Sequence, residues 1–303
     1  MENTAKFKRE QPDLSVIVVS YNIADLLGNC LKSVLVPDNI AKEVFVVDNA
    51  SSDGSSDFIK DKFPSVHLIA NTENRGFASA NNQMLPRCKG KYIFFLNPDT
   101  EVMSDTFNEA ISFIDANPRV GLAGTKIINP DGTLQWSVSY KYPGQKYTTN
   151  ELSDLPGKIA CVLGASMIAR SEIIKKIGGF DEKFFLYGED QDLCLRIRKL
   201  GYEIGYNDSA VVVHLGGRTE RNFASSDTWR KKILAEYVFY KKHYLPETIT
   251  KISRAHLVKA CWRIATLNLT IPFMKDKARA KEKLIKYQVI YHTIKNFVHQ
   301  LPR

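Results

Sequence analysis

Residues 92–100, Tyr-Ile-Phe-Phe-Leu-Asn-Pro-Asp-Thr, join a strand-forming run to a carboxylate that stands behind a proline. The residues from Tyr92 to Leu96 are all apolar or aromatic, which is typical of a strand buried on both faces of a sheet. Pro98 restricts Asn97 to an extended backbone, and Asp99 follows directly. This corner is either a plain turn or a site where a metal ion holds a diphosphate.

Three more strands are predicted before this one. Leu14–Val19 and Glu43–Asp48 are continuous β-branched runs, Val66–Ile69 is shorter, and apolar residues at helical spacing follow each of them. Strand and helix alternating at this spacing indicate right-handed βαβ crossovers and a mostly parallel, doubly wound α/β sheet. Further along we expect a helix over 105–116, strands at 120–124, 159–169 and 211–214, and a helix over 188–201.

Polar residues follow each of these first four strands, at Ser20-Tyr21-Asn22, Asp48-Asn49, Asn71–Arg75 and Asn97–Asp99. Any one of these could be only a turn, but four at the edge where a parallel sheet binds ligands indicate a site. The chain has no GxxxxGK[ST] loop and no glycine fingerprint after its first strand, which excludes a P-loop and makes an NAD site unexpected. We therefore expect a divalent cation, Mg²⁺ or Mn²⁺, to neutralise the diphosphate, with Asp99 as a carboxylate ligand.

Charge is distributed unevenly along the 303 residues. Residues 216–303 hold 19 Lys and Arg against 6 Asp and Glu, whereas residues 1–215 hold 23 basic against 27 acidic residues. Aromatic residues such as Trp229, Tyr237, Tyr240 and Trp262 interleave with the basic ones. A solvated helical face is one interpretation, and we prefer a surface that docks on an anionic membrane. No nucleic-acid-binding motif accompanies the charge, so no nucleic-acid partner is expected.

Cysteine usage and the N-terminal residues bear on the compartment. The five cysteines form no CxxC motif and their number is odd, which favours a reducing compartment. The first 15 residues contain no apolar segment of the kind found in a signal peptide. We expect a cytoplasmic protein, peripheral at the inner face of the plasma membrane.

Three carboxylates crowd the start of the helix predicted over 188–201, at Glu189, Asp190 and Asp192. Acidic residues are common at helix N-termini, where they interact with the macrodipole, and one would suffice as a cap. Three in four residues repel one another, which suggests a chemical use. Asp192 is expected to form an ion pair with Arg196, one helical turn further on.

Seven blocks of the chain resemble, in order, those of family 2 glycosyltransferases, and most of all the bacterial rhamnosyltransferase-like branch. They are VIVVSYN, VVDNASSDGS, NRGFASANN, FFLNPDT, GASMIARSE, GGFDEKFFLYGEDQDLCLRIRKLGY and VVVHLGG. The resemblance covers about residues 13–217 and implies a GT-A fold, a Rossmann-like mostly parallel sheet flanked by helices. We accordingly expect a GT-A domain over residues 1–217 and a basic helical C-terminal region over 218–303.

The resemblance also implies roles for individual residues. It places Ser20 and Tyr21 near the nucleotide base, Asp48 on the base or ribose, and Arg75 and Asn81 along the ribose and diphosphate. Asn97 and Asp99 occupy the first and third places of the family's DxD metal motif, so one carboxylate remains there. His214 matches a histidine that some relatives use as a metal ligand, although a structural histidine at a strand end is the other interpretation. Asp190 matches the catalytic base, with Glu189 orienting it or touching the acceptor.

Together these features predict an inverting glycosyltransferase of cell-surface polysaccharide synthesis. The donor would be a nucleotide sugar, with dTDP-rhamnose expected, and the acceptor a lipid-linked saccharide. A sugar nucleotidyltransferase is an alternative that would need a glycine- and basic-rich loop after the first strand. A scaffold that binds nucleotide sugar without catalysis is another, which the substitution at Asn97 keeps open.

Overall fold

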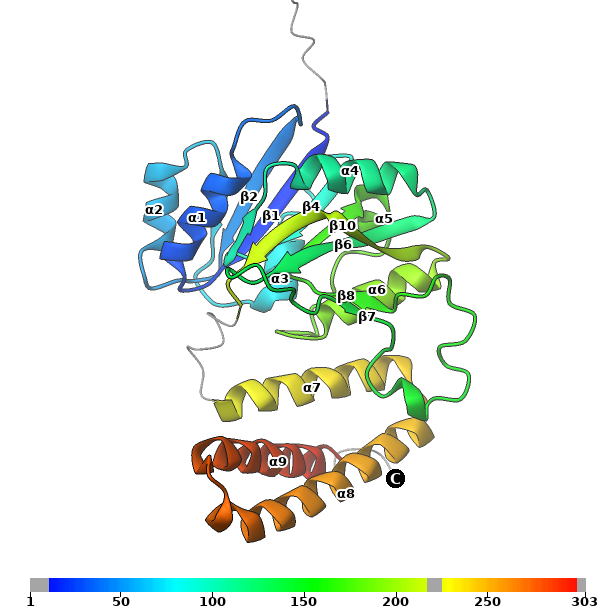
Figure 1. Ribbon diagram of the computed structural model, residues 1–303. Helices are drawn as coiled ribbons and strands as arrows, with labels where there is room; N and C mark the ends of the chain where they lie inside the picture. The colour runs from blue at the N-terminus through cyan, green and yellow to red at the C-terminus, as the bar shows by residue number, and fades with distance from the viewer. Residues whose placement is uncertain (1–10, 217–224, 299–303) are drawn as a thin grey trace, which may run out of the picture. The chain divides into compact units, whose positions relative to one another are not determined.

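A computed structural model describes residues 11–216 and 225–298 of the chain (Figure 1). The chain divides into two compact units. The first consists of Met1–Tyr140, Pro156–Glu182 and Glu189–Gly216, and the second of Lys141–Leu155, Lys183–Gly188 and Gly217–Arg303, each as far as the structure describes it. The domain boundary predicted after residue 217 lies outside the described residues.

The first unit is built on an eight-stranded sheet in the order β3-β2-β1-β4-β9-β6-β10-β5. Its strands are β1 (Leu14–Ser20), β2 (Lys42–Asp48), β3 (His67–Ala70), β4 (Tyr92–Leu96), β5 (Thr100–Val102), β6 (Val120–Ile128), β9 (Ser166–Arg170) and β10 (Glu203–His214). β9 and β5 run antiparallel to their neighbours and the other pairs are parallel. The predicted α/β class with a mostly parallel sheet is confirmed. Strand order reverses between β1 and β4. The last residues of these strands, Ser20 and Leu96, therefore lie beside the point where such sheets bind ligands.

Helices cover both faces of this sheet (Figure 1). They are α1 (Ala24–Val34), α2 (Ser55–Lys62), α3 (Gly76–Asn82), α4 (Thr106–Ala116), α5 (Ser171–Lys176) and α6 (Glu189–Lys199). Adjacent residues of β4 show the two faces. Phe94 packs against Phe107 of α4, with ring centroids 5.1 Å apart, and Phe95 packs against Phe180 at 4.9 Å. Because successive side chains of a strand point to opposite faces, β4 is apolar throughout and is buried on both sides.

The single strand predicted over 159–169 is wrong. Cys161–Val162 forms β8, which pairs with β7 (Val138–Ser139) in a small separate sheet, and β9 begins only at Ser166. The break between β8 and β9 was not predicted because the run is largely apolar, and its periodicity does not show which strand each part pairs with. The intervening residues, Leu163, Gly164 and Ala165, form a turn that reaches the candidate site.

The second unit is helical, as predicted for the C-terminal region. It contains η1 (Gln145–Tyr147), α7 (Ser225–His243), α8 (Pro246–Thr270), η3 (Ile271–Phe273) and α9 (Lys277–Val298). Tyr237, Phe239, Tyr240 and Tyr244 are buried and form its core, with Phe239 stacked on Tyr142. These four aromatics, which interleave with basic residues in the sequence, are therefore core residues, and docking of the basic region on a membrane stays a prediction. None of the helices in the described ranges is long and apolar enough to cross a lipid bilayer.

Candidate active site

Two buried polar groups lie side by side at the carboxyl ends of β1 and β2. Ser20 pairs in register with Asp48, and these residues are 0% and 2% exposed. Ser56 donates a hydrogen bond of 2.5 Å to one carboxylate oxygen of Asp48. The other oxygen, Oδ1, and the Ser20 hydroxyl have no hydrogen-bond partner among the described residues. A buried polar group without a partner costs about 1–3 kcal/mol, so this pair is suited to a polar ligand.

The turn after β1 is tied to the loop after β2. Asn22 takes a left-handed backbone, with φ 52°, and its side-chain oxygen accepts the Ser52 backbone N–H at 2.7 Å. Its own N–H donates to the Ser51 hydroxyl, and the Ala24 N–H donates to Asp53 at the start of α1. Tyr21 is half-buried between these anchors. This loop pair holds Tyr21 at the edge where the resemblance places a nucleotide base.

A network of side-chain amides fixes the loop after β3. The Asn49 side-chain oxygen accepts the Arg75 backbone N–H at 3.0 Å and the Asn71 side-chain amide at 3.1 Å, and its own side-chain nitrogen donates to Asn74. The Arg75 side chain is exposed and can extend over a bound phosphate. Asn49 was not predicted as a site residue, and its position directly after Asp48 was the only signal for it.

Asn81 lies inside α3 and is 1% exposed. Its amide nitrogen donates to the Phe77 carbonyl oxygen, four residues earlier in the same helix. The role given to Asn81 on the ribose or diphosphate stays a prediction.

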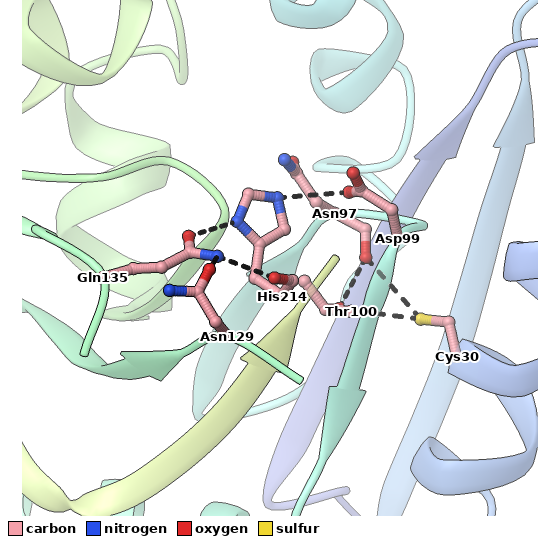
Figure 2. Close-up of polar contacts among 7 residues, drawn as sticks. All are labelled: Cys30, Asn97, Asp99, Thr100, Asn129, Gln135 and His214. Atoms are coloured by element: carbon pink, nitrogen blue, oxygen red, sulfur yellow. Dashed lines mark hydrogen bonds and ion pairs between the residues drawn. The ribbon is translucent and has the colours of Figure 1, made fainter. Parts of the chain in front are cut away.

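The corner after β4 is built around the Asn97 carbonyl oxygen. This oxygen accepts the Thr100 hydroxyl at 2.6 Å and lies 3.6 Å from the Cys30 thiol (Figure 2). The Asp99 carbonyl oxygen accepts the Leu215 backbone N–H at 2.9 Å, which ties the corner to the end of β10. These hydrogen bonds are local to a turn, so the interpretation of this corner as a plain turn accounts for its backbone conformation. It does not explain the direction of the Asp99 carboxylate.

That carboxylate points at His214 from β10. Asp99 Oδ1 lies 3.3 Å from His214 Nε2 (Figure 2). The other ring nitrogen, Nδ1, lies 2.9 Å from the side-chain oxygen of Gln135. The side-chain nitrogen of Gln135 donates to the His214 carbonyl oxygen and to the Asn129 side chain. Since the Gln135 nitrogen is occupied as a donor, its oxygen accepts from Nδ1–H, and Nε2 is the ring nitrogen that faces Asp99. Gln135 was missed because it is 79 residues from His214 in a loop without any pattern.

Asp99 and His214 fit a divalent cation. A histidine whose Nδ1–H is bound by a second residue is the usual arrangement of an imidazole ligand, with Nε2 left for the metal. Mg²⁺ and Mn²⁺ accept few protein ligands and complete their shell with phosphate oxygens and water. Within the described residues no group of three or more His, Cys, Asp or Glu side chains forms a complete metal site. Asp99, His214 and the half-buried Asn97 would therefore share the ion with a bound diphosphate.

The two carboxylates predicted for catalysis open α6. The Asp190 carboxylate accepts the backbone N–H of Gly164 at 3.1 Å and that of Gln191 at 2.8 Å. Glu189 is 7% exposed, and its Oε2 has no hydrogen-bond partner in the described part of the chain. Asp192 is fully buried and pairs with Arg196 at 2.7 Å, which confirms the predicted ion pair.

Burial changes the proton affinity of this pair. It raises the pKa of Asp190 above its ordinary value, against the lowering effect of the two backbone N–H groups. Burial and then the Asp190 charge raise the pKa of Glu189 to about 8. A carboxylate with a raised pKa is a stronger base, and at neutral pH Glu189 holds a proton beside it.

This pair predicts a pH-dependent stability. The folded protein retains a proton on Glu189 up to about pH 8, whereas the unfolded chain loses it near 4.5. Folding therefore binds a proton between these values, and stability falls as pH rises from 4.5 to 8. We expect Glu189→Gln, which mimics the protonated side chain, to raise the Tm at pH 8.5 by roughly 5–10 °C and to change it little at pH 4.5. Thermal melts across pH check this, with the exposed Glu172→Gln as control; parallel profiles for Glu189→Gln and the wild type would contradict it.

One turn joins the catalytic pair to the diphosphate corner. Gly164 N–H donates to Asp190, and the carbonyl oxygen of the next residue, Ala165, accepts the Asn97 N–H at 2.9 Å. A Cβ on Gly164 would lie 3.4 Å from the Cβ of Asp190, in van der Waals contact, so the turn and the start of α6 are closely packed. The predicted base and the predicted metal corner are thus held on either side of the turn formed by Gly164 and Ala165.

Comparisons with known proteins show the family of this chain. The model of glycosyl transferase family 2 matches residues 15–178, more than half of the chain. The chain belongs to glycosyltransferase family 2. A second family model, described as the N-terminal domain of galactosyltransferase, matches residues 145–215 of this glycosyltransferase. The two matches together span every residue predicted for the site.

Relatives of this glycosyltransferase include the N-acetylglucosaminyl-diphospho-decaprenol L-rhamnosyltransferase of Mycobacterium tuberculosis, to which it is 25% identical, over 66% of this chain and 75% of that protein. It is 24% identical to the low-salt glycan biosynthesis hexosyltransferase Agl10 of Haloferax volcanii, over 80% and 81% of the two chains. The predicted resemblance to family 2 and its rhamnosyltransferase-like branch is confirmed.

Solved structures support the fold of this glycosyltransferase. A mannosyltransferase from Pyrobaculum calidifontis, in complex with GDP-mannose and Mn²⁺, superposes with a TM-score of 0.61 at 19% identity, over 97% of this chain and 89% of that one. Residues 1–349 of TarS from S. aureus, in complex with UDP, give 0.53 at 16% identity, over 95% and 92%. The predicted GT-A fold is confirmed.

Proposed function

We propose that this glycosyltransferase transfers a sugar, with inversion, from a nucleotide-sugar donor to a lipid-linked saccharide in cell-surface glycan synthesis. The observation that carries the proposal is the Gly164–Ala165 turn, which ties Asp190 to one side and Asn97 to the other. An inverting transfer requires a base on the acceptor hydroxyl and positive charge on the departing diphosphate, on opposite sides of the sugar.

The donor would lie along the carboxyl edge of the sheet. The unpartnered Asp48 oxygen and Ser20 hydroxyl would bind the base or ribose, with Tyr21 beside them. The exposed Arg75 would reach the diphosphate. A divalent cation, held by Asp99 and His214 with Asn97 beside them, would supply positive charge to the leaving group. Gln135 keeps the His214 ring in the orientation and tautomer that this requires.

Asp190 would act as the base. The acceptor hydroxyl oxygen forms a bond to the anomeric carbon while the bond from that carbon to the diphosphate oxygen breaks. The hydroxyl proton passes to the Asp190 carboxylate, and the electron pair of the broken bond stays on the nucleoside diphosphate. Its raised pKa makes Asp190 better matched to this task than an exposed aspartate. Glu189, protonated at neutral pH, keeps a second negative charge away from the base.

The assignments of the donor and the acceptor rest on the relatives. The relative from M. tuberculosis is named as a rhamnosyltransferase acting on a decaprenol-linked N-acetylglucosaminyl diphosphate. By analogy we assign dTDP-rhamnose as donor and a polyprenyl-diphosphate-linked saccharide as acceptor. An acceptor of this kind is held in a membrane by its lipid, and the basic C-terminal region would dock on that membrane.

The donor assignment predicts selective stabilisation by one nucleotide. Purified protein is melted with dTDP, UDP or GDP, each with Mn²⁺ or with EDTA. We expect dTDP with Mn²⁺ to raise the Tm by several degrees, because a ligand at about 100 times its Kd stabilises the folded state by about 2.7 kcal/mol. A larger Tm shift with UDP or GDP would replace dTDP by that nucleotide in the donor assignment. No shift with any nucleotide would contradict both the proposed transfer and the scaffold that binds nucleotide sugar.

A further inference from the structure

The C-terminal half of α8 and the η3 turn expose a line of large apolar side chains. Val258 is 70% exposed, Trp262 60%, Leu269 73% and Phe273 89%. We call these four residues the apolar ridge. Large apolar side chains exposed singly are ordinary, but four in succession along one element indicate an interaction surface.

The helical repeat places the ridge on one face. With 3.6 residues per turn, steps of 4 and 7 residues return Val258, Trp262 and Leu269 of α8 to nearly the same direction over roughly 16 Å, and Phe273 follows in the η3 turn. Ala260 and Leu267 lie on the opposite face of α8 and are buried. The ridge is therefore the outer side of a helix whose inner side is already packed. Between Arg263 and Lys275 the sequence carries no charged residue.

Basic side chains flank the ridge at both ends. Lys251, Arg254 and Lys259 are exposed before and beside its first residue, and Lys275 and Lys277 are exposed after its last. Arg263 lies near the Trp262 and Tyr287 rings, at 5.6 Å and 5.5 Å, and so steadies Trp262. An apolar stripe with cations at its margins matches a bilayer surface, where the apolar groups enter the acyl boundary and the cations meet anionic headgroups.

We propose that the apolar ridge inserts into the surface of an anionic lipid bilayer. A second copy of the chain is a poorer occupant, because two ridges facing each other would bring together two sets of basic flanks. The proposal rests on the proposed function only for its purpose, which is to bring the enzyme to a lipid-linked acceptor. Membrane binding itself needs neither donor nor catalysis.

Flotation of the full chain with vesicles tests the ridge. The vesicles are pure phosphatidylcholine, or phosphatidylcholine with phosphatidylglycerol as the anionic lipid. The test variant is Leu269→Gln with Phe273→Gln, both highly exposed, so folding should be kept. Val36→Gln, an exposed apolar residue of the first unit, is the matched control (53% exposed). We expect binding to the anionic vesicles, a decrease of about 10- to 100-fold in the double variant, and no change in the control.

The outcomes distinguish insertion of the apolar ridge from binding by charge alone and from dimer formation. Failure of the wild type to float with anionic vesicles at moderate salt overturns the proposal. Undiminished binding of the double variant also overturns it, because charge alone would then suffice. A dimer in lipid-free sedimentation that the double variant abolishes would assign the ridge to a second copy. Transfer to a short-chain, water-soluble acceptor should be equal in wild type and double variant, and loss of transfer in both would bear on the proposed function and leave the ridge unaffected.

Discussion

Replacing Asp190 by Asn is expected to lower kcat by about 10²- to 10⁴-fold, the usual contribution of a general base. The one side-chain oxygen of Asn can still accept the Gly164 N–H, which keeps the 163–165 turn in place, while the bond from the Gln191 N–H is lost. Nucleotide affinity should therefore be unchanged, and the Tm should be equal or higher because a buried carboxylate has been removed. Steady-state kinetics with nucleotide sugar and acceptor, together with thermal melts, measure both effects.

Asp192 provides the matched control for this variant, two residues further along α6. It is fully buried and paired with Arg196, so Asp192→Asn should lower stability by about 3–5 kcal/mol while folded enzyme keeps its kcat. An Asp190→Asn enzyme with near-normal turnover would remove Asp190 from catalysis. A strain that retains its glycan with Asp190→Asn would support the scaffold alternative.

Removing the Asp99 carboxylate is the second large effect. We expect Asp99→Asn to abolish the gain in nucleoside-diphosphate affinity that Mn²⁺ provides and to reduce kcat/KM by about 10²-fold or more, because charge at the leaving group is worth several kcal/mol. Affinity measured in EDTA should be the same for variant and wild type. Titration calorimetry with dTDP, in Mn²⁺ and in EDTA, measures the difference.

The exposed Asp61→Asn of α2 controls for the loss of one negative charge. A Mn²⁺ effect that persists in Asp99→Asn would show that the corner after β4 is only a turn. Retained Mn²⁺ dependence together with wild-type kcat/KM would then place the cation elsewhere. These outcomes answer the question that the carboxylate behind Pro98 poses.

The sequence predicted the first half of the sheet well. β1, β2 and β4 are continuous apolar runs, and a strand buried on both faces leaves a clear signal in composition. The direction and partner of a strand leave none, so the antiparallel insertion of β9 between β4 and β6 could not be predicted.

The site was predicted in part for the same reason. Asp99 and Asp190 stand beside regular elements and belong to motifs. Gln135 lies in a loop, and only its distance to His214 in space shows its role. The burial of the α7 aromatics was not predicted. Basic residues lie on several sides of this helix, so the sequence does not show which face is apolar, and packing in the core of the second unit determines that face. Patterns record local periodicity, whereas these contacts depend on tertiary packing.

The turn over 163–165 sets a limit on how this enzyme can diversify. Consecutive Cα atoms are about 3.8 Å apart, and a displacement of about 1 Å at a reacting centre can cost 10²-fold in rate. One residue inserted or deleted here would shift Asp190 against Asn97 by far more than that. The segment over 129–157 is constrained as well where Gln135 contacts His214. We therefore expect the spacing of the predicted base and the leaving group to be inherited unchanged while selection for new acceptors acts elsewhere.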